Sequence, residues 1–436
     1  MISPLMACLI GVVVFLVLLG FGLPIFVTMG LGSIIGIVLM GQPALLTNFS
    51  VIAFESGYSW SFVAVPLFVF MGLLVVHHKL GERLFTSVYS WIGHVPGGLG
   101  ISASIFSALF GFVCGSGTAG VITCGGVCLP EMTKRKYNLR FALGTLATTG
   151  GLSALMPASV LMILYSVLAE ASLGRLFMAG MIPGFVLVGL ISLYIIVRAK
   201  LNPELAPPGP KSSWKERFRS LTGMIPVALI FLCVIGGLYS GVWTAIEAGG
   251  VAASVAFIVA LFCSKVTWTT VKAAALDTIK VFGMLYMLQI SANLVSFLFY
   301  VSGTSALIST YTLGWNLPGW AVILIMWIVM FILGGPLEPP AILVICTPIF
   351  LPIVEKLGYD STWFGVFMVL ACELATLSPP VGMSIFAIMR VAPGGTSLKD
   401  VNLGILPYMF IICVLVVLII FFPQIVMWLP GKLVEG

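Results

Sequence analysis

The sequence predicts an all-α polytopic membrane protein built from two inverted-topology repeats, each containing a re-entrant hairpin and a discontinuous helix. Three observations lead to this prediction. Hydrophobic residues make up 60% of the 436-residue chain and charged residues only 8%, whereas soluble domains carry about 25% charged residues. Apolar runs recur along the whole chain. Breaks rich in glycine and proline interrupt these runs at matching places in the two halves, as expected for internal repeats within a membrane.

The apolar runs set the number of predicted membrane segments. At about 20 residues for each spanning helix, the chain has room for about a dozen crossings or re-entrant segments. Stretches near 44–56, 81–93 and 265–280 mix polar and aromatic residues and are expected to lie along the membrane surface. The apolar runs lie at about 5–20, 24–40, 60–77, 98–114, 119–130, 139–155, 158–169, 176–198, 222–240, 243–262, 281–300, 319–334, 340–354, 362–376, 380–391 and 403–429.

The first hairpin is predicted over 98–130. Its two apolar arms meet at 115–118, a Gly-Ser-Gly-Thr segment that makes a poor helix. The next two runs make one crossing over 139–169, broken at Pro157, which cannot donate a backbone hydrogen bond. Broken backbone at membrane depth is tolerated only where it is buried in protein or lines a cavity. We therefore expect both breaks to border a site that binds something polar.

The same arrangement is predicted near the C-terminus. A second hairpin, at about 305–354, has apolar arms at 319–334 and 340–354 that flank a proline-rich segment. A second crossing over 362–391 is broken at two consecutive prolines, and a last span follows at 403–429. The two regions are interpreted as two halves of one site.

Constant spacings support this repetition. Four pairs of glycines or prolines recur at a spacing of 219 or 222 positions: Gly22 with Gly241, Gly30 with Gly249, Pro130 with Pro352, and Pro157 with Pro379. We therefore predict a first repeat at 1–198, a cytoplasmic linker at 199–221 and a second repeat at 222–436.

Lysine and arginine indicate the orientation, because cytoplasmic loops carry an excess of both. The polar segment 198–219 holds six of them, and the loop after the first hairpin, 134–140, holds four. The loop after the second hairpin, 355–360, is not basic. The first hairpin is therefore expected to open to the cytoplasm and the second to the outside, with the N-terminus on the outer side.

Polar groups at the breaks suit ion and anion binding. Carbonyls near Leu155 and Leu377 lose their helical partners, and together with hydroxyls they offer the oxygen ligands that a hard monovalent cation requires. Half-helix N-termini after each break carry partial positive charge, which suits an anionic substrate. The alternative is that these small residues only allow close helix packing. The hydroxyls belong to Ser116, Thr118, Ser153, Ser159, Thr376 and Ser378.

Glu338 is the most informative single residue, because carboxylates within membranes are rare and it lies between prolines at the predicted second tip. It is expected to contribute to a cation site; the alternative is that it reaches the membrane surface and is solvated. Glu373 and Glu247 each represent either a functional acid or a polar helix-packing contact. Arg390 ends the second broken crossing and is expected to extend to the cytoplasmic face, with a direct role at the substrate as the alternative.

Other function classes find no support in the sequence. It contains no Ser-His-Asp set, no metal-binding cluster and no phosphate-binding loop, so neither an enzyme nor an ATPase is predicted. The net charge of +6 sits in a few loops and is not a nucleic-acid-binding patch. An intramembrane hydrolase would need paired carboxylates or Ser/His pairs within spans.

With these motifs, the chain resembles the large membrane subunit (the M or DctM-type subunit) of tripartite ATP-independent periplasmic (TRAP) transporters over essentially its whole length. The resemblance rests on five segments, at 111–120, 150–159, 172–184, 241–248 and 376–382. Together these segments are specific to the family, whereas any one alone would be weak.

The resemblance implies a sodium-driven elevator of ion-transporter-superfamily type in the bacterial cytoplasmic (inner) membrane. A transport domain made of both hairpins and both broken helices would slide against a scaffold. Two protein partners are implied, a small four-helix membrane subunit (Q type) and a periplasmic substrate-binding protein (P type), besides membrane lipid. Substrates of the family are mostly small organic anions.

The resemblance also implies two Na⁺ sites near the tips and breaks. By position, one would use Ser116 with backbone near Gly115 and Pro157. The other would use backbone near Gly335 with Glu338 and Ser378. The residues expected close to the substrate are Gly117, Thr118, Ser153, Ser159, Thr376, Pro379 and Gly382.

The chain departs from the family pattern in four places, one of which is Pro157-Ala158-Ser159 where the family has Pro-Pro-Ser. Positions 114–117 read Cys-Gly-Ser-Gly where the family has Ser-Gly-Ser-Ser, and Glu338 replaces an aspartate. The arginine expected in sialate-type members is absent from 293–303. A smaller anion, a sulfonate or a short carboxylate, is therefore expected. The alternative function is a stand-alone sodium/anion symporter of the same architecture that needs no binding protein.

Overall fold

The computed structural model describes residues 2–58, 60–314, 317–335, 337–378 and 382–432. Helices dominate these ranges, and no β-strand occurs in them. Within the same ranges, five helices are long and apolar enough to cross a membrane, or up to seven spans if each of two bent helix pairs counts as one. The prediction of an all-α polytopic membrane protein is therefore confirmed.

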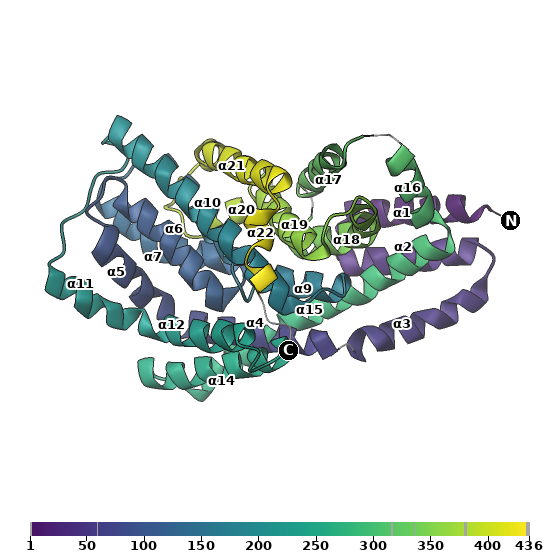
Figure 1. Cartoon of the computed structure of the whole chain (residues 1–436), viewed down its shortest axis with the longest axis horizontal. Coiled ribbons are helices and arrows are strands. Elements are labelled where there is room, and N and C mark those ends of the chain that lie inside the picture. Colours follow the sequence, from purple (N-terminus) through teal and green to yellow (C-terminus); the bar gives the residue numbers. More distant parts are fainter. Residues whose placement is uncertain (1, 59, 315–316, 336, 379–381, 433–436) are drawn as a thin grey trace.

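The first half of the chain runs from α1 to α10, and Figure 1 shows these helices in purple to teal. Its central helices are short because the chain breaks them at residues 115–116 and 152–159. The bounds are α1 (Pro4–Gly20), α2 (Ile25–Leu39), η1 (Pro43–Leu46), α3 (Thr47–Tyr58), η2 (Trp60–Val63), α4 (Ala64–His77), α5 (Leu80–Ile92), α6 (Gly98–Cys114), α7 (Gly117–Lys134), α8 (Leu139–Gly151), η3 (Leu152–Ala154), α9 (Val160–Leu168) and α10 (Leu173–Leu201).

The second half follows a linker and shows corresponding breaks near residues 334–338 and 377–382. A π-helical turn, η5, lies between α12 and α13. The bounds are α11 (Trp214–Ser220), η4 (Leu221–Gly223), α12 (Ile225–Phe231), η5 (Leu232–Gly236), α13 (Gly237–Tyr239), α14 (Ala245–Cys263), α15 (Trp268–Val301), α16 (Thr304–Gly314), α17 (Gly319–Leu333), α18 (Pro339–Lys356), α19 (Ser361–Thr376), α20 (Met383–Met389), α21 (Leu398–Phe421), α22 (Gln424–Met427) and η6 (Pro430–Lys432).

Helix bounds recur between the halves at the spacings seen in the sequence. Helices α7 and α18 both have 18 residues and start 222 positions apart, and α8 and α19 also start 222 positions apart. The turns after α1 and α13 use Gly22 and Gly241, both with positive φ, at 80° and 69°. The division of the chain at 198 and 222, and the sidedness of each half, stay predictions.

One element differs between the halves. Residues 47–77 form α3, a short 3-10 turn and α4, whereas the corresponding region of the second half is a single helix, α15, of 34 residues. At 1.5 Å for each residue, α15 is about 50 Å long, and Figure 1 shows it running beside α2. The second hairpin proper comprises α17 and α18, since α16 is a separate helix before it.

The linker between the halves is attached to the first half by backbone hydrogen bonds. Ala206 O accepts from Gly97 N at 3.1 Å, and Leu205 O accepts from Asn138 N at 3.1 Å. Trp91 on α5 also stacks edge-on against Phe218 of α11, with ring centroids 5.7 Å apart. The polar linker therefore lies along the ends of α5, α6 and α8.

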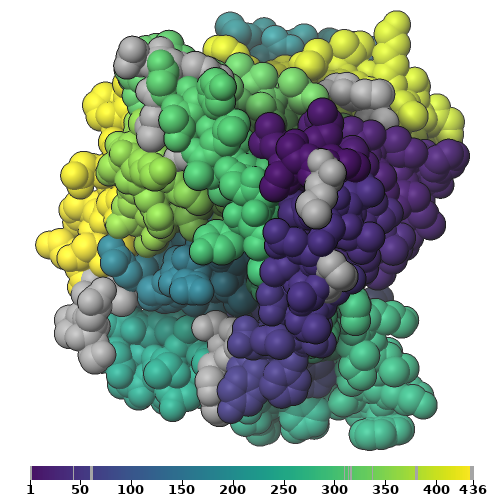
Figure 2. Space-filling model, turned by 90° about the vertical axis from the view of Figure 1, so that its right-hand side faces the viewer, coloured from purple at the N-terminus to yellow at the C-terminus, as the bar shows by residue number. Residues whose placement is uncertain are grey.

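The N-terminal helices present apolar side chains outward. Leu9 and Val13 of α1 are 57% and 49% exposed, and Phe54 of α3 is 73% exposed. Figure 2 shows the N-terminal part of the chain, in purple and indigo, beside green parts of the second half. Such a surface suits contact with lipid or with another membrane helix.

Candidate functional site

The tip of the first hairpin is a two-residue break between α6 and α7. Gly115 has a φ of 62°, in the left-handed region that side-chain-bearing residues rarely adopt. Ser116 is the N-cap of α7, and its Oγ accepts a hydrogen bond from Ala119 N at 3.4 Å. The local sequence thus ends one helix and starts the next within two residues.

This tip is bonded to the break in the crossing of the same half. Gly115 O accepts from Val160 N at 3.0 Å, and Ser116 O accepts from Ser153 Oγ at 3.4 Å. A Cβ on Gly115 would collide with the carbonyl oxygen of Ala158. Residues 115 and 116 therefore contact residues on both sides of Pro157 directly.

The break itself extends over several residues. Helix α8 ends at Gly151, and Ala158 adopts a φ of 70°, unusual for a residue with a side chain. Ser159 then caps α9, its Oγ accepting from Met162 N at 3.3 Å. Pro157 and Ser159 are both buried.

The second half repeats this design. Helix α17 ends at Leu333, and Glu338 is the N-cap residue of α18 but makes no side-chain capping hydrogen bond. A Cβ on Gly334 would collide with Ala375 of α19, so the second tip also packs closely on the second broken crossing. Pro336, at this tip, lies outside the described residues.

The second broken crossing ends its first helix at Thr376 and resumes at Met383. The Thr376 hydroxyl donates to Glu373 O at 2.7 Å and accepts from Ser384 Oγ at 3.1 Å. Gly382 is buried against the Thr376 carbonyl, which leaves no room for a Cβ. Ser378 is buried as well, whereas Pro379 lies outside the described residues.

A cavity of about 370 Å³ lies where the two tips and the second break meet. Six of the residues predicted from the sequence line it: Gly115, Ser116, Gly117, Thr118, Glu338 and Thr376. Six others lie in the surrounding breaks and are not among its described lining residues: Ser153, Pro157, Ser159, Gly335, Ser378 and Gly382. Helices α4 and α15 complete the wall with apolar residues such as Val69 and Met284.

Glu373 also lines this cavity. The sequence alone left open whether this residue is a functional acid or a helix-packing contact. It lies on α19 and is only 7% exposed. Its Oε1 is 2.9 Å from the position that a Cβ on Gly117 would take, and its Oε2 contacts the corresponding position on Gly151. An acid from the second half of the chain therefore lies against the hairpin tip and the broken crossing of the first half. The only feature of the sequence that could have indicated this position is a carboxylate within an apolar run.

The lining of this cavity is acidic. It contains Glu338 and Glu373, and among its described residues it contains no lysine, arginine or histidine. Arg390 is exposed and does not line it. Glu338 also borders a second cavity of about 590 Å³ beside the α1–α2 turn, with Leu23 and Met284 in its wall.

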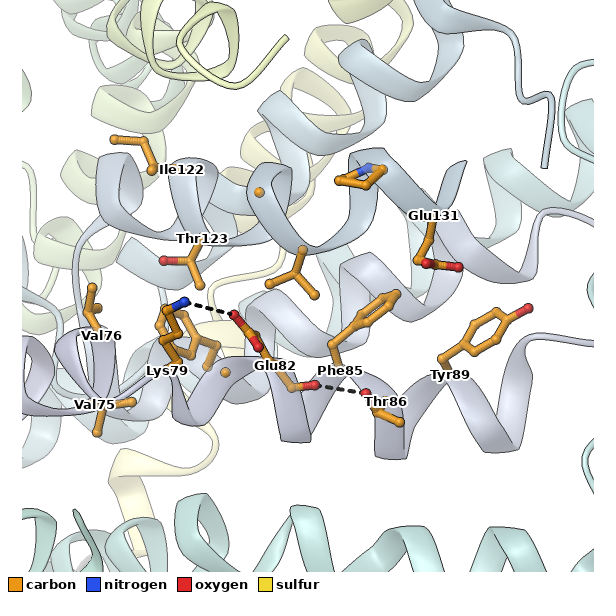
Figure 3. Close-up of a pocket in the computed structure, with 15 residues that line it drawn as sticks. Val75, Val76, Lys79, Glu82, Phe85, Thr86, Tyr89, Ile122, Thr123 and Glu131 are labelled. Carbon is orange, nitrogen blue, oxygen red and sulfur yellow. Dashed lines mark hydrogen bonds and ion pairs between the residues drawn. The ribbon is translucent and has the colours of Figure 1, made fainter. Parts of the chain in front are cut away.

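Another cavity, of about 680 Å³, lies between α5 and α7 and holds none of the predicted site residues. Figure 3 shows Lys79 and Glu82 paired at one end of it, at 4.0 Å, and Tyr89 and Glu131 at the other. Its polar side chains come from Lys79, from the amphipathic helix α5 and from α7.

Metal binding by a cluster of acidic, histidine or cysteine side chains finds no support. In the described part of the chain, no three such residues come together to hold a metal ion. Glu247, the other acid left undecided, forms a capping box with Thr244 at the start of α14, its Oε2 accepting from Thr244 N at 2.8 Å.

Comparisons with known proteins agree with this architecture. The chain is 29% identical over 401 residues to the C4-dicarboxylate TRAP transporter large permease protein DctM of Pseudomonas aeruginosa, covering 91% of this chain and 92% of the relative. It is 28% identical to the ectoine TRAP transporter large permease protein TeaC of Halomonas elongata, over 98% of this chain and 99% of the relative.

Solved structures show the same fold at lower sequence identity. The Alcanivorax borkumensis YdaH transporter superposes with a TM-score of 0.61 at 16% identity, covering 89% of this chain and 90% of that one. The family model for the DctM component of tripartite ATP-independent periplasmic transporters matches residues 12–425. This chain therefore belongs to the family of DctM components, the large permeases of tripartite ATP-independent periplasmic transporters.

Proposed function

We propose that this protein is a sodium-coupled transporter subunit that imports a small organic anion, with a carboxylate or sulfonate group, by an elevator mechanism. The observation that carries the proposal is the cavity of about 370 Å³ in which both hairpin tips and the second helix break converge. Discontinuous helices that face one shared cavity are the usual way in which secondary transporters bind substrate and ion together.

Two sodium sites are proposed beside this cavity. The first uses Ser116 with backbone oxygens near Gly115 and Pro157, and it is supported by the direct bonding of the first tip to the first break. The second uses Glu338 with backbone near Gly335 and with Ser378. Hydroxyl, carbonyl and carboxylate oxygens are the ligands that a hard cation prefers.

The transport unit would comprise both hairpins and both broken crossings, α6–α9 and α17–α20. The close contacts of each tip with its neighbouring break support movement of these elements as one body. A scaffold would include α1–α3 and α15. Because the family is tripartite, the proposed partners are a small membrane subunit of the Q type and a periplasmic substrate-binding protein of the P type.

The proposed location is the bacterial inner membrane, with the N-terminus on the periplasmic side. The basic linker and the basic loop at 134–140 support a cytoplasmic position for both. The outward-facing apolar side chains of α1 and α3 are proposed to contact lipid or the small membrane subunit.

Uptake into proteoliposomes tests this function. The protein is reconstituted with a small membrane subunit and a binding protein of the proposed types, and uptake is measured for succinate, isethionate, N-acetylneuraminate and ectoine with and without an inward sodium gradient. Uptake of at least one solute is expected only with the gradient, and Glu338→Ala is expected to abolish it.

Two results would contradict the proposal. Uptake that is independent of sodium and unchanged in Glu338→Ala would remove the ion-site assignment. Sodium-driven uptake without a binding protein would instead favour the stand-alone symporter.

A further inference from the structure

Glu373 is the buried acid that the proposed sodium sites leave unused. Its side chain is 7% exposed, and among the described residues its carboxylate has neither a hydrogen bond nor an ion pair. The carboxylate faces the cavity and lies against Gly117 in the first turn of α7. A buried carboxylate without a partner is costly, so an occupant of the cavity that supplies positive charge would be bound favourably.

No basic side chain among the described lining residues supplies that charge. The lining holds two carboxylates, Glu338 and Glu373, with hydroxyls and apolar groups. The nearest lysine in sequence to the α15 part of the wall, Lys280, is paired with Asp277 at 3.2 Å. With Glu338 assigned to the sodium ion, a solute carrying only negative charge would still meet the like charge of Glu373 and no fixed positive side chain among the described lining residues.

We infer that the substrate is a zwitterion, a small solute whose carboxylate or sulfonate is accompanied by a protonated amine or an amidinium that pairs with Glu373. This inference rests on the proposed function and narrows its substrate class. Glu338 remains assigned to the sodium ion, so the two acids have separate roles.

Hydroxyl groups in the same cavity suit the acid group of such a solute. The Thr118 hydroxyl lines the cavity and makes no hydrogen bond among the described residues. Ser116 also lines the cavity, and so does Ser384 of α20, whose hydroxyl donates to Thr376 Oγ1 at 3.1 Å. A volume of about 370 Å³ is near the lower end of the range of about 300–1,000 Å³ for ligand pockets, which fits a small solute.

Matched pairs of solutes isolate the effect of the cationic group on uptake from the effects of size and of the acid group. Taurine and isethionate differ only in an ammonium in place of a hydroxyl, as do 4-aminobutyrate and 4-hydroxybutyrate. Each of these, with ectoine and succinate, is tested as substrate and as competitor in the reconstituted uptake assay. Solutes that carry a positive group are expected to be transported, and their hydroxyl or dicarboxylate counterparts are expected to compete at least about tenfold less well.

Variants of Glu373 test the contact itself. Glu373→Gln keeps the shape and removes the charge, and it is expected to raise the KM for the zwitterion at least about tenfold without changing the sodium concentration for half-maximal uptake. Glu373→Asp is expected to recover part of the affinity. Glu355→Gln is the matched control, an exposed acid at the far end of α18, and is expected to behave as the unmodified protein.

Each outcome is distinguishable from failure of the proposed function. If sodium drives uptake only of solutes without a positive group, the inference is wrong while the function stands. If Glu373→Gln changes the sodium dependence but not the preference among solutes, Glu373 serves the ion and the inference is again wrong. If no solute is taken up under a sodium gradient, the proposed function itself fails.

Discussion

Gly115 shows how a single residue connects the two breaks of the first half. Its positive φ allows α6 to end and α7 to begin within two residues, and its missing side chain lets the Ala158 carbonyl approach. The hydrogen bond from Val160 N to Gly115 O, at 3.0 Å, depends on that approach. The residue is therefore required both for the turn and for the contact.

Replacing this glycine is expected to destabilise the protein. In Gly115→Ala the left-handed conformation alone costs about 1–2 kcal/mol, and the collision with Ala158 adds to it. An apparent thermal midpoint lower by about 2 °C or more is expected in detergent-purified protein. Gly126→Ala is the control, because a Cβ there meets no atom within 4 Å; an equal loss in both variants would contradict this interpretation.

Ser116 gives a second prediction at this scale. If it binds sodium, replacing potassium by sodium at constant ionic strength should raise the free energy of unfolding, by about 2.7 kcal/mol at a hundredfold excess over Kd, and with it the thermal midpoint. In Ser116→Ala this gain should shrink. Ser172→Ala is the matched control, since Ser172 also caps a helix, α10, far from the breaks in sequence. An unchanged sodium effect in Ser116→Ala would remove Ser116 from the site.

At the scale of elements, close packing holds α8 against α21. A Cβ on Gly144 would collide with the backbone of Gly404, and one on Gly404 would collide with the Arg140 carbonyl. The neighbouring hydroxyls of Thr145 and Tyr408 are hydrogen-bonded. The two helices thus approach closely where both have glycine, as is common between membrane helices.

Overpacking this crossing should therefore be costly. Gly144→Ala is expected to destabilise the protein by about 1–3 kcal/mol, because neither backbone can move away without disturbing its helix. Gly189→Ala on α10, where a Cβ meets nothing within 4 Å, is expected to be neutral or slightly stabilising. Thermal unfolding of both variants checks the difference, and an unaffected Gly144→Ala would show that α8 and α21 separate easily.

Some helix breaks could be predicted from sequence patterns alone, and others could not. Glycine and proline disfavour helix locally, so the breaks at 115–116 and 334–338 could be predicted from composition alone. The difference between α3–α4 and the continuous α15 could not, because both regions have similar apolar patterns. Whether such a stretch bends depends on what packs beside it.

At the scale of the whole molecule, the proposed orientation in the membrane predicts which positions can be labelled from the outside. Lys211 lies in the basic linker and Gln42 in the turn after α2, and both are exposed. A membrane-impermeant maleimide is expected to label Gln42→Cys in intact spheroplasts but Lys211→Cys only after lysis. Labelling of both, or the reverse pattern, would overturn the predicted orientation. The unmodified chain, with nine cysteines, sets the background.

The sequence by itself determined the membrane class, the helical breaks and the family, because these follow from local composition and from spacings along the chain. It also identified Glu338, since an acid between prolines is visible locally. Only the tertiary structure decided that Glu373 of α19 lies against Gly117 of α7, and that both tips share one acidic cavity with the second break. The physical reason is that charge in a low-dielectric cavity depends on which residues meet across the two halves, and chain spacing does not encode that juxtaposition.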